Sequence, residues 1–249
     1  MSHTGFAAAL RRFACLGLLA AAAPAFAHYL WLEHDGAGAR LYFGEVNEVR
    51  EQSPGRLDEI PKPRVLKLAT GGATRELQPQ RLRGAFAIAD ATAPQHLVAI
   101  ESGYEVRDWS RQGIGVVKPM FYARLGAWPA REAVPVDPAL RLDVQPLPGL
   151  PDVVQVLLDG QRLPAAKLVV HAPNGWDQEL QADARGQVAL ALPWRGQYVL
   201  EVIHKENVPG EYQGRHYDAI RHRATLTVMQ PRGIDPAGTG SLAPRHPDR

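Results

Sequence analysis

The sequence predicts an all-β fold. Glycine and proline are frequent, with 23 and 21 of the 249 residues. Long helical patterns are scarce, whereas short alternations of apolar and polar residues recur between turn residues, which is typical of strands. We expect two β-sandwich domains, at residues 28–137 and 138–230, preceded by a leader at 1–27 and followed by a disordered tail at 231–249.

The first 27 residues resemble a cleavable secretory signal. Arg11 and Arg12 provide the positive end, an apolar run covers 13–23, and Ala25 and Ala27 form a small-x-small cleavage site. The run is shorter than the ~20 residues that span a bilayer. We therefore expect a periplasmic protein that is not membrane-embedded and whose mature chain begins at His28.

Composition narrows the classes of partner. Cys15 is the only cysteine and would leave with the leader, so the mature protein would have no disulfide and no thiolate metal site. Removing Arg11 and Arg12 lowers the basic residues from 28 to 26, against 26 acidic residues. A net charge of zero gives no indication of nucleic acid or an anionic membrane as partner.

The first half reads as short strands and turns. Strands are expected at 29–32, 40–43, 65–68, 85–88, 97–101 and 116–124, and the polar segment 45–60 is expected to be a loop with at most a helical turn. Prolines from 129 to 151 predict an extended, stiff connection, so we place the domain boundary near residue 137.

The second half shows clearer alternation. Strands are expected at 153–158, 167–171, 187–192, 197–204 and 223–228. In the last of these, Ala224, Leu226 and Val228 share one face, while Arg223, Thr225 and Thr227 share the other.

Several motifs carry a family resemblance. The segments 159–160, 167–170, 183–186 and 196–198 resemble a transthyretin-like, or Cna-B-type, β-sandwich, a module that by itself specifies no activity. Together with the histidine at the mature end and the segments 42–45, 118–124 and 224–227, the chain resembles the NikM-like family. The resemblance implies a periplasmic protein. Some members of this family are parts of nickel or cobalt uptake systems and bind metal at their N-terminus, and many have unknown function. Members of nickel-uptake systems are fused to or encoded with a membrane component, whereas this sequence has no transmembrane segment, so transport itself does not follow.

His28 is the first candidate ligand. At a mature N-terminus it would offer both an α-amine, with an ordinary pKa near 8, and an imidazole, with one near 6.5. This pair chelates Cu(II), Ni(II) or Co(II) in the usual order of affinity. The alternative is that cleavage leaves an arbitrary residue at the start.

A second candidate cluster lies near the C-terminal strands and contains His204, His216 and His222. If 197–204 and 223–228 form an antiparallel pair that turns near Gln213 and Gly214, then His204 and His222 are directly opposite, with Cβ atoms about 5 Å apart. They could share a metal ion; the alternative is a set of polar strand ends around a solvated loop.

Other polar residues allow weaker interpretations. Glu45, Glu48 and Glu51 could supply carboxylate oxygens, but a charged exposed loop explains them equally well. Glu33, His34 and Asp35 are explained by a solvated turn, and we interpret His171 as structural. No hydrolase or phosphate-binding motif is present in the sequence.

These observations predict a non-enzymatic, periplasmic protein that binds a transition-metal ion through His28 and acts in metal uptake or handling. Nickel or cobalt is the expected metal, with copper and iron as alternatives. His204 or His222 is the expected helper, and a membrane metal transporter or receptor is a candidate partner. Two alternatives remain. One is a metal-independent interaction module that docks a transporter or receptor, and the other is an oxidative enzyme with a copper histidine brace.

Overall fold

The computed structural model describes residues 28–36, 38–69, 73–91 and 96–236. The predicted leader and residues 237–249 of the predicted tail lie outside this part of the chain. Strands dominate the described residues, so the all-β prediction is confirmed. Two short 3₁₀ helices, η1 (Arg56–Glu59) and η2 (Ser110–Gln112), are the only helical segments there. In the same residues, no helix has the length and apolar character needed to cross a membrane.

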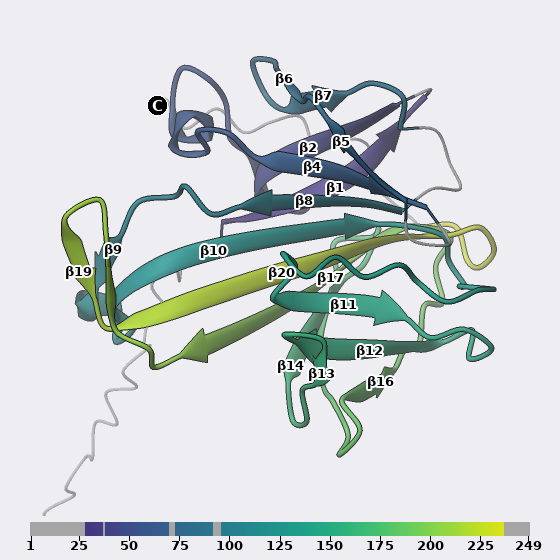
Figure 1. The fold of residues 1–249 in the computed structure, drawn as a ribbon. Coiled ribbons are helices and arrows are strands. Elements are labelled where there is room, and N and C mark those ends of the chain that lie inside the picture. Colours follow the sequence, from purple (N-terminus) through teal and green to yellow (C-terminus); the bar gives the residue numbers. More distant parts are fainter. Residues whose placement is uncertain (1–27, 37, 70–72, 92–95, 237–249) are drawn as a thin grey trace, which may run out of the picture.

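A nine-stranded sheet, here called sheet B, runs through the centre of the molecule (Figure 1). Its strand order is β15 (Asp177–Gln181), β14 (Lys167–His171), β17 (Gly196–Glu206), β20 (Ala219–Gln230), β10 (Gly115–Leu125), β8 (His96–Glu101), β4 (Arg64–Leu68) and β5 (Thr74–Leu77), and β9 (Arg107–Trp109) pairs with β10. Neighbouring strands are antiparallel except β10 and β20, which run parallel.

Smaller sheets cover the two faces of sheet B. Sheet A contains β1 (Tyr29–Asp35), β2 (Gly38–Glu45), β3 (Val49–Arg50), β6 (Gln80–Arg81) and β7 (Phe86–Ile88). Sheet C contains β11 (Leu142–Pro146), β12 (Val153–Leu158), β13 (Gln161–Arg162) and β16 (Gln187–Ala189). A separate hairpin, β18 (Gly210–Tyr212) and β19 (Arg215–Tyr217), projects from one end.

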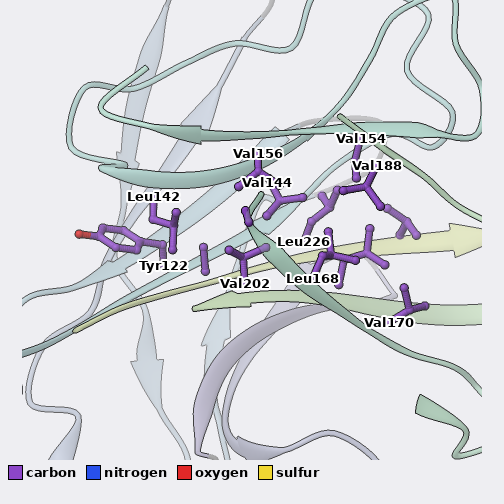
Figure 2. Packing of buried hydrophobic residues seen from close by; sticks show 14 of the residues in the cluster. Tyr122, Leu142, Val144, Val154, Val156, Leu168, Val170, Val188, Val202 and Leu226 are labelled. Carbon is purple, nitrogen blue, oxygen red and sulfur yellow. The ribbon is translucent and has the colours of Figure 1, made fainter. Parts of the chain in front are cut away.

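Alternation along the strands of sheet B divides the core into layers. Tyr122, Val202 and Leu226 point toward sheet C and join its residues in one apolar cluster (Figure 2). Phe121 and Ala123, the neighbours of Tyr122 along β10, instead pack toward sheet A. The predicted alternation of 223–228 is confirmed, because Ala224, Leu226 and Val228 belong to the cluster facing sheet C. Each fully buried Leu or Val contributes about 1.5–3 kcal/mol relative to its exposed state.

The expected division at residue 137 does not separate two sheets. β10 lies before this residue and β20 after it, yet the two strands pair along their length, from Val117 opposite Ala219 to Leu125 opposite Thr227. Backbone hydrogen bonding thus joins both halves in sheet B, so the boundary falls within one continuous structure.

The proline-rich connection is also more ordered than predicted. Within the expected linker, Leu142 and Val144 of β11 are fully buried in the core between sheets B and C. Pro146 is the last residue of this strand. Among the described residues β11 pairs only with β12, so it is an edge strand of sheet C. An edge strand tolerates a proline, which lacks the backbone N–H.

Candidate metal site at His28

His28 immediately precedes β1, where Tyr29 pairs with Gly44 of β2. This register places the end of β2 and the start of the following loop beside the His28 ring. The ring packs against Phe43, with ring centroids 5.5 Å apart, and the side chain is only 14 % exposed. Glu45 is the last residue of β2 and faces Nδ1 of the ring. Glu51 directly follows β3 and faces Nε2. β-Strand pairing therefore builds the surroundings of His28.

Glu51 orients the imidazole. Its Oε1 is in hydrogen-bond contact with Nε2 of His28. A carboxylate can only accept, so we assign the ring proton to Nε2, which leaves the lone pair of a neutral ring on Nδ1. Arg56 adds a positive charge, with Nη1 3.2 Å from Nε2 and 3.9 Å from Oε1 of Glu51. Histidines that bind metals commonly donate their other ring N–H to a carboxylate in this way.

Nδ1 of His28 is buried and finds no hydrogen-bond partner among the described residues. Oε1 of Glu45 lies 3.2 Å away, which is an ion-pair distance, but the pair does not have hydrogen-bond geometry. Two ligand atoms that each lie about 2.0–2.2 Å from one metal ion, at angles between a right angle and the tetrahedral angle, are about 2.8–3.5 Å apart. The two atoms therefore have a separation that fits two ligands of one ion.

Burial is the main cause that favours the neutral form of the His28 ring. Burial lowers the pKa of His28, the hydrogen bond to Glu51 opposes this, and the charges of Arg56 and Arg223 lower the pKa further. Burial and the neighbouring Glu48 raise the pKa of Glu45. A neutral imidazole is the form that binds metal.

The site has few side-chain donors. Within the described ranges, no three His, Cys, Asp or Glu side chains are grouped so as to hold a metal ion. Nδ1 of His28 and Oε1 of Glu45 could supply two side-chain ligands. The third would be the α-amine of His28, which belongs to the same residue as Nδ1 and would close a six-membered chelate ring.

The predicted helper histidines lie elsewhere. His204 and His222 are directly opposite each other on β17 and β20, as the sequence predicted. However, His222 points toward sheet C with Tyr122, whereas its neighbour Arg223 reaches the carbonyl of His28 on the opposite face. The body of sheet B thus separates His28 from His222.

Both ring nitrogens of His222 are already engaged. Tyr122 donates its hydroxyl to Nδ1 over 3.0 Å, and Nε2 donates to Glu206 over 2.7 Å. Burial lowers the pKa of His222, which is fully buried. His204 is half-buried, and His216 is exposed on the β18–β19 hairpin, 3.3 Å from Asp218. The structure therefore does not bring His204, His216 or His222 to His28.

The remaining polar candidates form structural contacts. Glu33 accepts hydrogen bonds from Trp31, Arg50 and Gln197. His34 and Asp35 end β1, which at about 3.3 Å per residue lies roughly 20 Å from its beginning. His171 is nearly buried and contacts Asp177 and Glu201.

Comparisons with known proteins add little to this geometry. No protein-family model and no curated protein matches the chain. Among solved structures, the chain is similar to the FN1-FN3 domains of chicken CNTN1, with 8% identity and a TM-score of 0.20. The match covers 82% of this chain and spans 65% of the length of that one. A similarity of this size supports no argument about function.

Proposed function

We propose that the protein is exported, is cut after Ala27, and holds a divalent transition-metal ion at His28 as a metal-handling protein rather than an enzyme. The observation that carries this proposal is the buried, unbonded Nδ1 of His28, which lies 3.2 Å from a carboxylate oxygen of Glu45 among the described residues. Both atoms are acceptors, and a cation between them would satisfy both.

The donor set restricts the metal. An amine, an imidazole and a carboxylate suit Cu(II), Ni(II) and Co(II), with affinity rising from cobalt to copper. The absence of a thiolate in the mature chain disfavours soft Cu(I). We therefore propose a divalent ion as the cargo. From the family resemblance alone, we propose a membrane transporter or receptor as the partner that receives it. The resemblance to the NikM-like family agrees with this role.

The first test is the native mass of the protein after expression with its leader in a bacterial periplasm, with Cu(II), Ni(II) and Co(II) supplied in turn. We expect a chain that begins at His28 and retains one ion. His28→Ala should lose the ion, whereas His216→Ala should retain it, because His216 is exposed on a distant hairpin. A chain that starts elsewhere, or one that retains no ion, would contradict the proposal and favour the interaction-module alternative.

A further inference from the structure

The backbone carbonyl of His28 contacts a buried arginine of the central sheet. Arg223 of β20 donates from Nη1 to the backbone carbonyl of His28 over 3.1 Å. Its guanidinium also lies over the ring of Tyr29, 4.9 Å from the centroid. Arg223 is 4 % exposed, although arginines are seldom buried unless they are paired.

A chain of polar contacts, buried except at its last member Asp177, fixes this guanidinium in place. Nε of Arg223 donates to Glu201, and the other oxygen of Glu201 lies 3.2 Å from Nε2 of His171. Nδ1 of His171 contacts Asp177 over 2.8 Å, and Tyr29 stacks on the His171 ring, with centroids 5.5 Å apart. The network therefore runs across β20, β17, β14 and β15 and ends beside the residue that follows His28.

The same side of β20 holds more of β1. Thr225 donates its hydroxyl to the carbonyl of Leu30 over 2.7 Å. Arg223 and Thr225 are two residues apart on β20, as are His28 and Leu30 at the start of β1. β1 is an edge strand of sheet A, so no further described strand pairs with this side of its backbone. The side chains of Arg223 and Thr225 instead donate to every second backbone carbonyl there, those of His28 and Leu30.

We propose that Arg223, held by Glu201, is a positioning residue that preorganises His28 for metal chelation. This inference rests on the proposed function. A chelate through the α-amine and Nδ1 depends on the orientation of the His28 backbone relative to its ring. Glu51 and Phe43 hold the ring, and Arg223 holds the carbonyl. With ring and carbonyl both fixed, the direction of the α-amine is restricted, and less conformational freedom is lost when an ion binds.

A merely structural ion pair must be distinguished from a positioning one, and the chain provides a matched control. Arg124 of β10 is buried on the other face of sheet B and forms a bidentate pair with Asp143 of β11, at 2.9 and 2.6 Å. It resembles Arg223 in burial, in its position on a central strand and in having an acidic partner, but it does not contact His28.

The experiment compares the mature wild-type protein with Arg223→Lys, Glu201→Gln and Arg124→Lys. Competition with a chelator measures Cu(II) and Ni(II) affinity, EPR of the Cu(II) form reports the ligand geometry, and circular dichroism identifies the variants that fold. We expect Arg223→Lys to weaken binding about 10–100-fold, the usual effect of losing a residue that orients a metal ligand, and to change the EPR spectrum. Glu201→Gln should also weaken metal binding and change the EPR spectrum. If Arg223→Lys does not fold, Glu201→Gln is the variant that tests the proposal.

Arg124→Lys should keep the affinity within about twofold and the spectrum of the wild type, whatever its stability. The proposal is overturned if the folded Arg223 and Glu201 variants keep wild-type affinity and spectrum, or if Arg124→Lys weakens binding equally. In either of these results the wild type still binds, so the proposed function stands. A wild-type protein that binds no ion would overturn both.

Discussion

Glu45 and Glu51 face different nitrogens of one imidazole, and this difference separates their expected effects. Glu45 would ligate the ion next to Nδ1, whereas Glu51 holds the ring through Nε2. Glu51→Gln should therefore weaken metal binding about tenfold, the usual effect of changing a residue that hydrogen-bonds to a metal ligand. Glu45→Gln should weaken binding more, because it removes an anionic ligand. Chelator competition at constant pH measures both.

Glu48 provides the control for charge alone. It lies in the same turn, and its backbone N–H donates to the carbonyl of Glu45 over 3.1 Å. Glu48→Gln removes one negative charge nearby without removing a proposed ligand, and it also removes a group that raises the pKa of Glu45, so affinity should not fall as it does in Glu45→Gln. An equal loss in Glu45→Gln and Glu48→Gln would show that general acidity, not ligation, attracts the ion.

At the level of single residues, the sequence identified part of this site. It indicated His28 and named Glu45 and Glu51 as possible oxygen donors, but it did not connect them. The connection depends on the pairing of Tyr29 with Gly44, which brings the loop after β2 back to His28. Arg223 was assigned to the correct face, yet nothing local could show that this face meets β1, because 195 residues separate Arg223 from His28.

The predictability of the elements follows their burial. Strands with long apolar alternation, such as β12 and β14, have the predicted bounds. The strands that escaped prediction are short or polar: β15 reads Asp-Gln-Glu-Leu-Gln, and β13 has only two residues. β11 was missed for a different reason, since its prolines favoured a linker, while the burial of Leu142 and Val144 against sheet B stabilises a strand there.

Sheets B and C are joined across β10 and β11 by the buried Arg124–Asp143 pair. Asp143→Ala would leave the guanidinium of Arg124 buried without its anionic partner, which should lower the free energy of unfolding by about 3–5 kcal/mol. Replacing both residues, in the double variant Arg124→Met with Asp143→Leu, should recover most of this loss, because apolar side chains of similar size avoid the cost of burying charge. Urea denaturation measures both changes.

The exposed pair Arg141–Asp159 is the comparison. It is also bidentate, with both distances 2.8 Å, but the Asp159 side chain is 51 % exposed. Asp159→Asn removes the charge but keeps a side chain that tolerates the positive φ of 50° at this position, so it should cost less than about 1 kcal/mol. The contrary result would be a double variant at Arg124 and Asp143 that is as unstable as Asp143→Ala. That result would show that the loss of unfolding free energy comes from poorer side-chain packing or from other lost hydrogen bonds, and not from an unpaired charge.

For the whole molecule, the continuity of sheet B predicts that the described part of the protein unfolds as one cooperative unit. Nine residue pairs join β10 to β20, and the core facing sheet C combines Leu66, Val98 and Tyr122 from the first half with residues from the second. Separating the halves at residue 137 would expose a strand edge and part of this core at once. We expect a single calorimetric transition in which the calorimetric and van't Hoff enthalpies agree. Leu226→Ala, at the centre of that core, should cost about 2–5 kcal/mol and lower the transition temperature without splitting the transition.

The same cooperativity determines how a bound ion affects stability. An ion that binds only the folded state stabilises whatever unfolds together with its site, by about 2.7 kcal/mol at a free concentration one hundred times its Kd. Because β1 is tied to β20 through Arg223 and Thr225, an ion at His28 should raise the temperature of the entire transition. Calorimetry with and without Ni(II) distinguishes this result from its alternative. Two transitions, of which only the first responds to metal, would show that the N-terminal sheet unfolds independently and that the contacts across β20 are too weak to join it to the rest.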